Sequence, residues 1–255
     1  MKKQKVAIVS LSSCKGCQFA LLNLGKKFID IMKNVEIVDF DLFKINSNSE
    51  LILDIGFVEG NPITEEDKKT LISLREKSKK LVVLGNCGAM GGIPEIKNYR
   101  EQKQSAKHFY RYIHGIKDEP IKEIDNFVKV DFTFPGCPIS GEEFLEYFPI
   151  ILESAISSKD FPKIPDKSVC IQCRAKGNRC LLLDKKPCFG SMILGGCDAV
   201  CPSYNMPCQG CRGLRPSTNI KEVRESLRNI INDEEFENIS EIYGLRDDIE
   251  AKEKK

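Results

Sequence analysis

The first half of the chain alternates short apolar runs with longer stretches of mixed polarity. The apolar runs have the length of buried strands and lie at residues 6–9, 35–40, 51–58, 81–85 and 128–134. The stretches 19–32, 64–78 and 141–156 have helical periodicity, and Thr64 with Asp67 three residues later is a helix-start signal. Nearly continuous apolar strands separated by helices are typical of a parallel sheet covered on both faces. The pattern therefore predicts an α/β fold, a doubly wound parallel sheet with the flavodoxin-like strand order.

Three segments do not follow this alternation. Residues 86–127 are predicted to form a long irregular insertion with a helix near 105–113. Residues 164–216 have few apolar residues, many prolines and glycines, and eight cysteines, so we expect a bound group to order this small irregular domain. After Pro216 a helix is predicted by apolar residues on one face, namely Ile220, Val223, Leu227 and Ile230. The predicted organisation is a flavodoxin-like domain at 1–163, an eight-cysteine domain at 164–216 and a C-terminal helical docking segment or tail at 217–255.

The composition narrows the classes of function. The chain has 255 residues and 41% apolar content, enough for a sizeable core in a soluble globular protein. Its 39 basic and 37 acidic residues balance, which argues against a nucleic acid or an anionic membrane as partner. No apolar run has the length of a signal-peptide core or a membrane span, so we expect a cytoplasmic protein whose thiols stay reduced. Twelve cysteines in such a protein point to metal binding.

Four of the cysteines follow predicted strands. Cys14 and Cys17 come after the run 6–9, Cys87 comes after 81–85, and Cys137 comes after 128–134. Open α/β sheets bind their ligands at the carboxyl ends of the strands, so we expect these four thiols to meet at one edge of the sheet. Neighbouring glycines and prolines, in GNCGAMGG and FPGCPIS, permit the tight loops that such a site needs.

The other eight cysteines divide into two sets in sequence order. The sets have the spacings C-x2-C-x6-C-x7-C and C-x3-C-x6-C-x2-C, and they are Cys170, Cys173, Cys180 and Cys188, then Cys197, Cys201, Cys208 and Cys211. Each set supplies four thiolates, which suits a structural zinc ion or an iron–sulfur cluster, and the spacing alone leaves both open. A zinc ribbon gives no reason for the third site spread over three loops. Three iron–sulfur clusters are the interpretation that covers all twelve cysteines.

Simpler interpretations apply to single features. The first cysteine pair alone has the spacing of a thioredoxin-like redox dithiol, but that interpretation leaves Cys87 and Cys137 unexplained. The two histidines, His108 and His114, lie in a polar stretch without metal-ligand spacing, and we interpret both as surface residues.

Taken together, these motifs resemble the small subunit of [NiFe] hydrogenases. The resemblance rests on four motifs in this order: SSCKGCQFALLNL, then GFVEGNPITEEDKKTLISLREKSKKLVVLGNCGAMGGIP, then FPGCPIS, then an eight-cysteine segment that ends in PCQGCRG. It covers roughly residues 5–215 and points to the cytoplasmic branch with the methyl-viologen-reducing hydrogenase of methanogens and the delta subunit of sulfhydrogenases. The related subunit of respiratory complex I matches poorly, because it has adjacent cysteines in place of CKGC and lacks the eight-cysteine segment.

The resemblance implies three [4Fe–4S] clusters and no catalytic residue in this chain. It assigns Cys14, Cys17, Cys87 and Cys137 to a proximal cluster beside the nickel–iron centre of a separate large subunit. It assigns Cys170, Cys173, Cys180 and Cys188 to a distal cluster, and Cys197, Cys201, Cys208 and Cys211 to a medial one. Periplasmic members carry a histidine at the first distal position and only three medial cysteines. Cys170 and Cys201 stand at the corresponding places here, which suggests all-thiolate ligation and lower potentials.

We therefore expect the electron-transfer small subunit of a cytoplasmic [NiFe] hydrogenase, an oxidoreductase acting on hydrogen. Its expected partners are the large subunit and a flavin- or ferredoxin-type electron-transfer subunit. Two alternatives remain open: an iron–sulfur adaptor of a non-hydrogenase oxidoreductase complex, and a zinc-stapled interaction protein on a flavodoxin-like scaffold.

Overall fold

The apolar runs of the first 163 residues form five parallel strands. They are β1 (Gln4–Ser10), β2 (Val35–Phe40), β3 (Leu53–Glu59), β4 (Ser78–Leu84) and β5 (Phe132–Phe134). Their order in the sheet is β2-β1-β3-β4-β5, so the predicted α/β fold with flavodoxin-like order is confirmed. The register pairs Val6 of β1 with Ile37 of β2 and Ile55 of β3, and it pairs Val82 of β4 with Phe132 of β5. β3 therefore lies between β1 and β4, the strands that precede Cys14 and Cys87.

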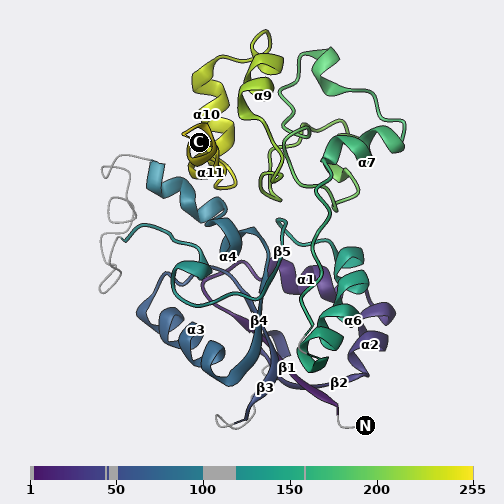
Figure 1. Cartoon of the computed structure of the whole chain (residues 1–255), viewed down its shortest axis with the longest axis vertical. Helices are drawn as coiled ribbons and strands as arrows, with labels where there is room; N and C mark the ends of the chain where they lie inside the picture. Colours follow the sequence, from purple (N-terminus) through teal and green to yellow (C-terminus); the bar gives the residue numbers. More distant parts are fainter. Residues whose placement is uncertain (1–2, 44, 46–50, 100–118, 158, 255) are drawn as a thin grey trace. The chain divides into compact units, whose positions relative to one another are not determined.

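The structure is a computed structural model that describes residues 3–43, 45, 51–99, 119–157 and 159–254. The chain divides into two compact units, Met1–Lys163 and Ile164–Lys255. In Figure 1 the first unit runs from purple to teal, and the second from green to yellow. No helix in these described ranges combines the length and the apolar character needed to cross a membrane.

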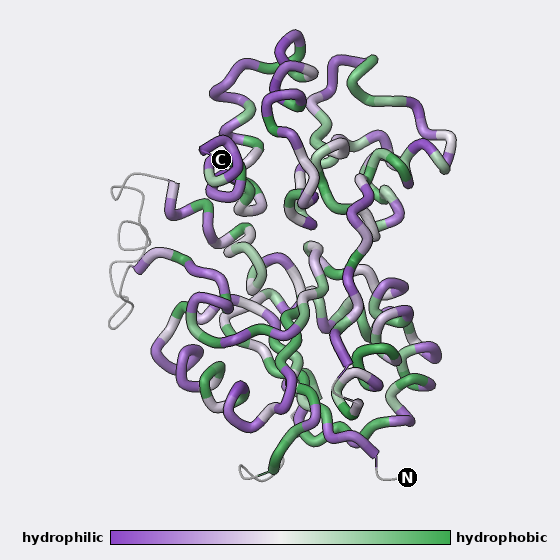
Figure 2. Tube along the Cα trace, in the orientation of Figure 1, coloured by the Kyte–Doolittle hydropathy of each residue, from purple (hydrophilic) through white to green (hydrophobic). Residues whose placement is uncertain are grey.

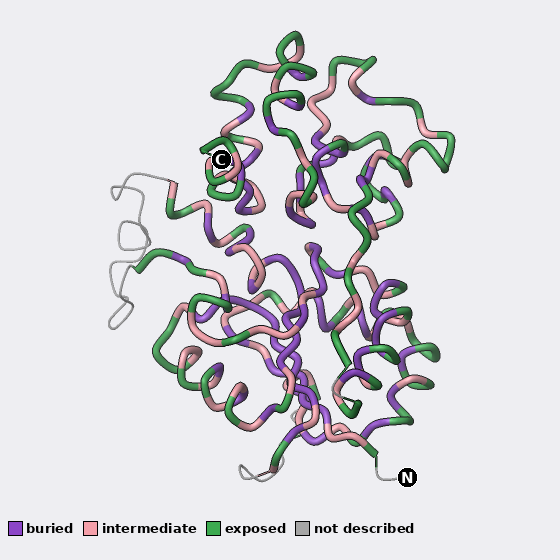
Figure 3. Tube along the Cα trace, in the orientation of Figure 1, coloured by how far each residue is buried: buried purple, intermediate pink, exposed green. Residues whose placement is uncertain are grey.

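Helices cover both faces of the sheet. Figure 1 shows α1 (Gly16–Leu22), α2 (Lys26–Met32) and α6 (Gly141–Ser157) on one side of the sheet and α3 (Glu65–Lys77) on the other. Phe144 and Phe148 of α6 pack on Phe57 of β3, with ring centroids 5.9 and 6.0 Å away. Leu71 and Leu74 of α3 belong to the apolar cluster on the opposite face. The strands are apolar and buried along most of their length, as Figures 2 and 3 show.

Two helix predictions had different outcomes. The helix start at Thr64 is confirmed, because its hydroxyl accepts from the Asp67 N–H (3.0 Å) and the Asp67 carboxylate accepts from the Thr64 N–H (2.9 Å). The single helix predicted over 19–32 is wrong, since α1 ends at Leu22 and α2 begins at Lys26. Gly25 between them has φ 56° and ψ −121°, a backbone conformation outside the helical region that glycine tolerates.

The region before β5 also differs from the prediction. The strand expected over 128–134 is paired only at Phe132–Phe134, because the Asp131 carboxylate accepts from the Leu81 N–H (2.9 Å) and caps the ladder. The insertion is less irregular than predicted, since it contains α4 (Asn86–Met90), η2 (Ile93–Tyr99) and η4 (Ile124–Asn126). The helix predicted near 105–113 and both histidines, His108 and His114, lie outside the described residues.

The second unit is built from short helices joined by loops. Its cysteine-rich part contains α7 (Val169–Ala175), η5 (Leu181–Asp184) and α8 (Val200–Ser203). Its C-terminal part is helical as predicted, but it forms three helices, α9 (Ile220–Leu227), α10 (Asp233–Glu241) and α11 (Arg246–Glu253). Ile220, Val223 and Leu227 are buried on one face of α9, as expected, whereas Ile230 lies beyond the end of that helix.

A small core holds this unit together. Phe189 from the cysteine-rich part is fully buried and lies 4.9 Å, between ring centroids, from Phe236 of α10. Arg224 of α9 lies over the Phe236 ring, with its guanidinium carbon 4.1 Å from the ring centroid, and it pairs with Glu253 of α11 at 2.7 Å. The charged C-terminal stretch is thus folded within the same unit as the eight cysteines, and the cysteine-rich part contributes buried apolar residues of its own.

Candidate metal centres

Four cysteines meet at the carboxyl ends of β1, β4 and β5. Cys14 lies in the loop after β1, Cys17 on the first turn of α1, Cys87 on α4 and Cys137 in the loop after β5. Hydrogen bonds join these loops, because the Gly85 N–H donates to the Phe134 carbonyl and the Asn86 N–H to the Gly136 carbonyl, both at 2.8 Å. The parallel sheet therefore brings together thiols that are up to 123 positions apart in the sequence.

Glycine at position 85 is required by the packing of these loops. Gly85 has φ 88°, and a Cβ added there would overlap the sulfur of Cys17 and lie 3.3 Å from the Gly136 carbonyl oxygen. The loop after β4 therefore touches the Cys17 thiol directly. Gly16 is similarly close to Cys14, since its Cβ would lie 3.2 Å from that sulfur.

The thiols of this group influence one another electrostatically. Burial is the main cause that raises the pKa of Cys17, and the charge of Glu59 is the next. A hydrogen bond from the Ile139 backbone lowers this pKa, whereas the charges of Cys137 and Cys87 raise it. Burial, then the charges of Cys137 and Cys14, raises the pKa of Cys87 to about 12. Thiols that disfavour one another's ionisation in this way would be stabilised as thiolates by a bound cation or cluster.

Two buried polar residues lie at the carboxyl end of β3, the strand between β1 and β4: Glu59 is its last residue and Asn61 comes two positions later. The Glu59 carboxylate accepts hydrogen bonds from the N–H groups of Cys17 (3.0 Å) and Gln18 (3.1 Å). Burial raises the pKa of Glu59, and these two N–H groups oppose that rise. The Asn61 amide donates to the carbonyl oxygens of Cys87 (2.6 Å) and Gly91 (3.2 Å). The sequence analysis missed both residues because neither is a cysteine. The sequence feature that could have indicated them is the Glu-Gly-Asn sequence at 59–61, where β3 ends.

The first set of four cysteines in the second unit is also brought together. Cys170 and Cys173 lie on α7, Cys180 precedes η5, and Cys188 follows it. Burial raises the pKa of Cys170 to about 11, and the charges of Cys188, Cys173 and Cys180, in that order, contribute further. The cysteines whose charges act on Cys170 are therefore the other members of the predicted set.

The second set lies next to the first. Burial raises the pKa of Cys208, opposed by a hydrogen bond from the Gly210 backbone, and the charges of Cys188, Cys211 and Cys197 raise it further. Burial and then the charge of Cys197 raise the pKa of Cys201. Cys188 faces both sets, because its sulfur accepts from the Cys208 N–H at 3.3 Å. A Cβ at Gly190 would lie 3.3 Å from the Cys170 sulfur and 3.7 Å from the Cys208 Cβ.

The donor chemistry of all three groups fits iron–sulfur clusters. Each group offers four thiols, and backbone or side-chain N–H groups donate to the sulfurs of Cys14 (3.4 Å), Cys173 (3.7 Å) and Cys188. N–H donors of this kind stabilise cluster-bound sulfur and tune its potential. Among the described residues, no group of three or more His, Cys, Asp or Glu side chains is arranged to hold a single metal ion.

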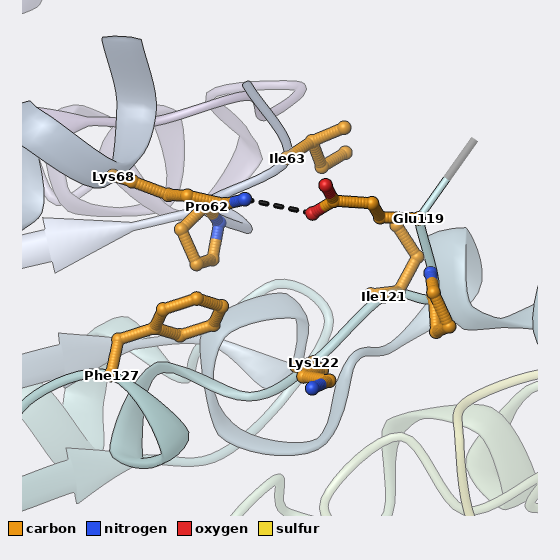
Figure 4. Close-up of a pocket in the computed structure, with 8 residues that line it drawn as sticks. Pro62, Ile63, Lys68, Glu119, Ile121, Lys122 and Phe127 are labelled. Atoms are coloured by element: carbon orange, nitrogen blue, oxygen red, sulfur yellow. Dashed lines mark hydrogen bonds and ion pairs between the residues drawn. The ribbon is translucent and has the colours of Figure 1, made fainter. Parts of the chain in front are cut away.

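A separate pocket lies on the first unit. It has a volume of about 320 Å³ and is lined by residues of the loop after β3, by Lys68 of α3 and by the segment 119–127. Figure 4 shows the ion pair between Lys68 and Glu119 (2.8 Å) at this pocket. No cysteine lines it, so it is distinct from the groups of thiols.

Comparisons with known proteins place these motifs in a family. A family model described as NADH ubiquinone oxidoreductase, 20 Kd subunit, matches residues 14–149. Sulfhydrogenase 2 subunit delta of Pyrococcus furiosus is 33% identical over 238 residues, which cover 91% of this chain and 95% of that protein. A subunit of the F420-non-reducing hydrogenase vhu of Methanocaldococcus jannaschii is 30% identical over 239 residues, covering 82% of this chain and 81% of the relative.

Solved structures agree on the fold. The actinobacterial-type NiFe-hydrogenase from Ralstonia eutropha H16 aligns with a TM-score of 0.61 at 14% sequence identity, over 83% of this chain and 79% of the other. The likeness extends beyond the first unit, because the aligned share exceeds the length of residues 1–163.

Proposed function

Because this chain belongs to the family of [NiFe] hydrogenase small subunits, we propose that it carries electrons between the nickel–iron centre of a separate large subunit and a redox partner subunit. The chain is in that case the electron-transfer part of an oxidoreductase, and hydrogen is converted in the large subunit. When bound, three [4Fe–4S] clusters would supply the one-electron steps. The observation that carries the proposal is the meeting of Cys14, Cys17, Cys87 and Cys137 at one edge of the sheet.

We assign the twelve thiols to three clusters. The proximal set is Cys14, Cys17, Cys87 and Cys137, the distal set Cys170, Cys173, Cys180 and Cys188, and the medial set Cys197, Cys201, Cys208 and Cys211. Support for the proximal set and for the set around Cys170 comes from the charges that act among their thiols. Cys188 acts on Cys208 more strongly than Cys211 and Cys197 do, so the division of the last eight thiols follows their spacing in the sequence. Cys188 of the distal set contacts Cys208 of the medial set, which supports electron transfer between the clusters of the second unit. The names distal and medial follow from the family resemblance.

The proposed exit to the redox partner is the distal set. Cys180 is exposed, and Leu183 beside it is 72% exposed. Two lysines follow in the sequence, Lys185 exposed and Lys186 half-buried, and the acidic neighbour Asp184 is paired with Arg179 at 2.8 Å. Because electron transfer needs close approach of two redox groups, an exposed ligand thiol among apolar and basic side chains suits the docking of a flavin- or ferredoxin-type subunit with an acidic face. The cytoplasm, which keeps thiols reduced, is the proposed location.

Metal analysis of the anaerobically purified chain tests the cluster content. About twelve iron and twelve sulfide per chain are expected if each set holds one [4Fe–4S] cluster. Stoichiometric zinc without iron would overturn the proposal in favour of a zinc-stapled interaction protein.

Co-purification tests the hydrogenase assignment separately. The native complex should contain a nickel-bearing large subunit and should evolve hydrogen from reduced viologen. A complex with all twelve irons but without nickel or hydrogen evolution would identify the chain as an iron–sulfur adaptor of another oxidoreductase.

A further inference from the structure

The carboxyl end of β3 carries two buried polar residues that are hydrogen-bonded to the loops of the proximal set. Glu59 is 3% exposed and Asn61 is 0% exposed, and neither belongs to a cysteine motif. β3 lies between β1 and β4 in the sheet, so the residues that follow it lie between the Cys14–Cys17 loop and the Cys87 loop. A buried polar side chain costs free energy unless it is hydrogen-bonded, which makes the partners of these two residues informative.

Glu59 holds the beginning of α1. The first N–H groups of a helix have no partner within the helix, and here Lys15, the residue before α1, has φ 59° and provides no side-chain cap. Glu59 supplies the cap from another strand, since its Oε1 accepts from the Cys17 N–H and its Oε2 from the Gln18 N–H. Its carbonyl oxygen also accepts from the Leu11 N–H at 2.8 Å. Both carboxylate oxygens are thus used to fix the backbone that carries the Cys17 thiol.

Asn61 holds the Cys87 loop in the same way. Its Nδ2 donates to the carbonyl of Cys87 at 2.6 Å and to that of Gly91 at 3.2 Å. One side chain therefore links a residue within α4 to the residue that follows this helix. Its backbone N–H donates to the Ser12 carbonyl at 3.0 Å, which ties the same residue to the loop before Cys14. Both carbonyls need a donor, so only one orientation of the Asn61 amide satisfies them.

We propose that Glu59 and Asn61 are positioning residues for the proximal cluster, Glu59 through the backbone of Cys17 and Asn61 through the backbone of Cys87. This inference rests on the proposed binding of a cluster by Cys14, Cys17, Cys87 and Cys137. Two of the three loops of the site are held by one segment of three residues that contributes no ligand. The orientation of ligands and the hydrogen bonds around sulfur tune the potential of an iron–sulfur cluster, so the proximal potential depends on both side chains.

Two isosteric substitutions test the inference. Glu59→Gln replaces one acceptor oxygen with an NH₂ group, so one of the Cys17 and Gln18 N–H groups loses its partner. Asn61→Asp replaces the donor with an oxygen that faces two carbonyls. The matched control is Asp131→Asn, because the Asp131 side chain is only 9% exposed and its carboxylate also accepts from a backbone N–H (Leu81, 2.9 Å), but at the opposite edge of the sheet, where it pairs with Arg75 (2.7 Å).

The measurements are made on the native complex. Redox titration followed by electron paramagnetic resonance should show a changed midpoint potential for one cluster in both test variants, and wild-type potentials for all clusters in Asp131→Asn. Amide hydrogen exchange should be about tenfold faster at residues 17–18 in Glu59→Gln and at residues 87–92 in Asn61→Asp, the loss expected for one hydrogen bond. If Glu59→Gln does not fold, Asn61→Asp and the milder Glu59→Asp carry the same two measurements.

The possible outcomes separate the two proposals. Full iron content with wild-type potentials in both test variants would overturn the positioning role and leave the cluster assignment intact. An equal change of potential in Asp131→Asn would also overturn it, because the effect would then come from general destabilisation. A wild-type chain without iron would refute the proposed function itself.

Discussion

Replacing Gly85 by alanine should remove one of the three proposed clusters. Gly85 has φ 88° and ψ 168°, a conformation that only glycine adopts readily, and an added Cβ would overlap the Cys17 sulfur. Gly25 provides the matched control, because it has φ 56° and ψ −121° but nothing within 4 Å of an added Cβ. Both substitutions strain the backbone of the same unit, and only Gly85→Ala displaces a proposed ligand.

The expected magnitudes follow from these two observations. Backbone strain costs about 1–3 kcal/mol at either position, which lowers the midpoint of thermal unfolding by roughly 2–4 °C for each kcal/mol in a unit of this size. Gly25→Ala should show this loss of stability alone. Gly85→Ala should in addition lower the iron content from about twelve to about eight per chain, since the proximal set would keep only three well-placed thiols.

Iron and sulfide assays, spin quantification and thermal unfolding monitored by circular dichroism measure the two effects independently. Full iron content and an unchanged spectrum in Gly85→Ala would refute the contact between the β4 loop and Cys17. Equal iron loss in Gly25→Ala would show that strain in the unit, and not displacement of the thiol, empties the site.

Three further predictions concern other parts of the chain. Cys87→Ser should abolish hydrogen evolution and weaken co-purification with the large subunit, because an incomplete site leaves three loops without their common ligand; normal turnover would contradict the assignment. Arg224→Met should destabilise the second unit by about 1–2 kcal/mol in urea unfolding, since it removes the pairing with Glu253 and the stacking on Phe236, and unchanged stability would argue against their role. In the iron-free chain, the free energy of unfolding should fall as the pH rises from about 9 to about 12. The reason is that the pKa of Cys87 is about 12 in the folded state and 9.0 in the unfolded state, so the unfolded state loses this proton first. A Cys87→Ser variant should show a shallower fall.

The periodicity of the sequence was sufficient for the sheet and for the placement of Cys14, Cys17, Cys87 and Cys137 after β1, β4 and β5. Continuous apolar runs such as VAIV and LVVLG have the length of buried strands and alternate with amphipathic helices, and parallel strands place their following loops at one edge. The failures were local. Gly25 divides a helix whose apolar pattern continues across it, and Asp131 shortens β5 through a side-chain hydrogen bond that no periodicity reveals.

The second unit was harder to predict because its core is shared between distant segments. The cysteine-rich part has too few apolar residues for a core of its own, and Phe189 packs against Phe236, which comes from α10. The charged C-terminal stretch carries that phenylalanine on a helix whose other residues are mostly polar. The apolar pattern of one segment does not show that its apolar residues pack against those of another segment distant in the sequence.

The positions of Glu59 and Asn61 show what a predicted topology can add to a search for motifs. A search for metal ligands stops at the cysteines, because glutamate and asparagine after a strand have many ordinary roles. The order β2-β1-β3-β4-β5, which the sequence predicts, requires that whatever follows β3 lies between the loops that follow β1 and β4. Those loops carry Cys14, Cys17 and Cys87, so a polar residue buried at the end of β3 has their backbone groups as its nearest hydrogen-bond partners, as Glu59 and Asn61 do. The strand order therefore identifies the residues that hold the site, before any side chain is placed.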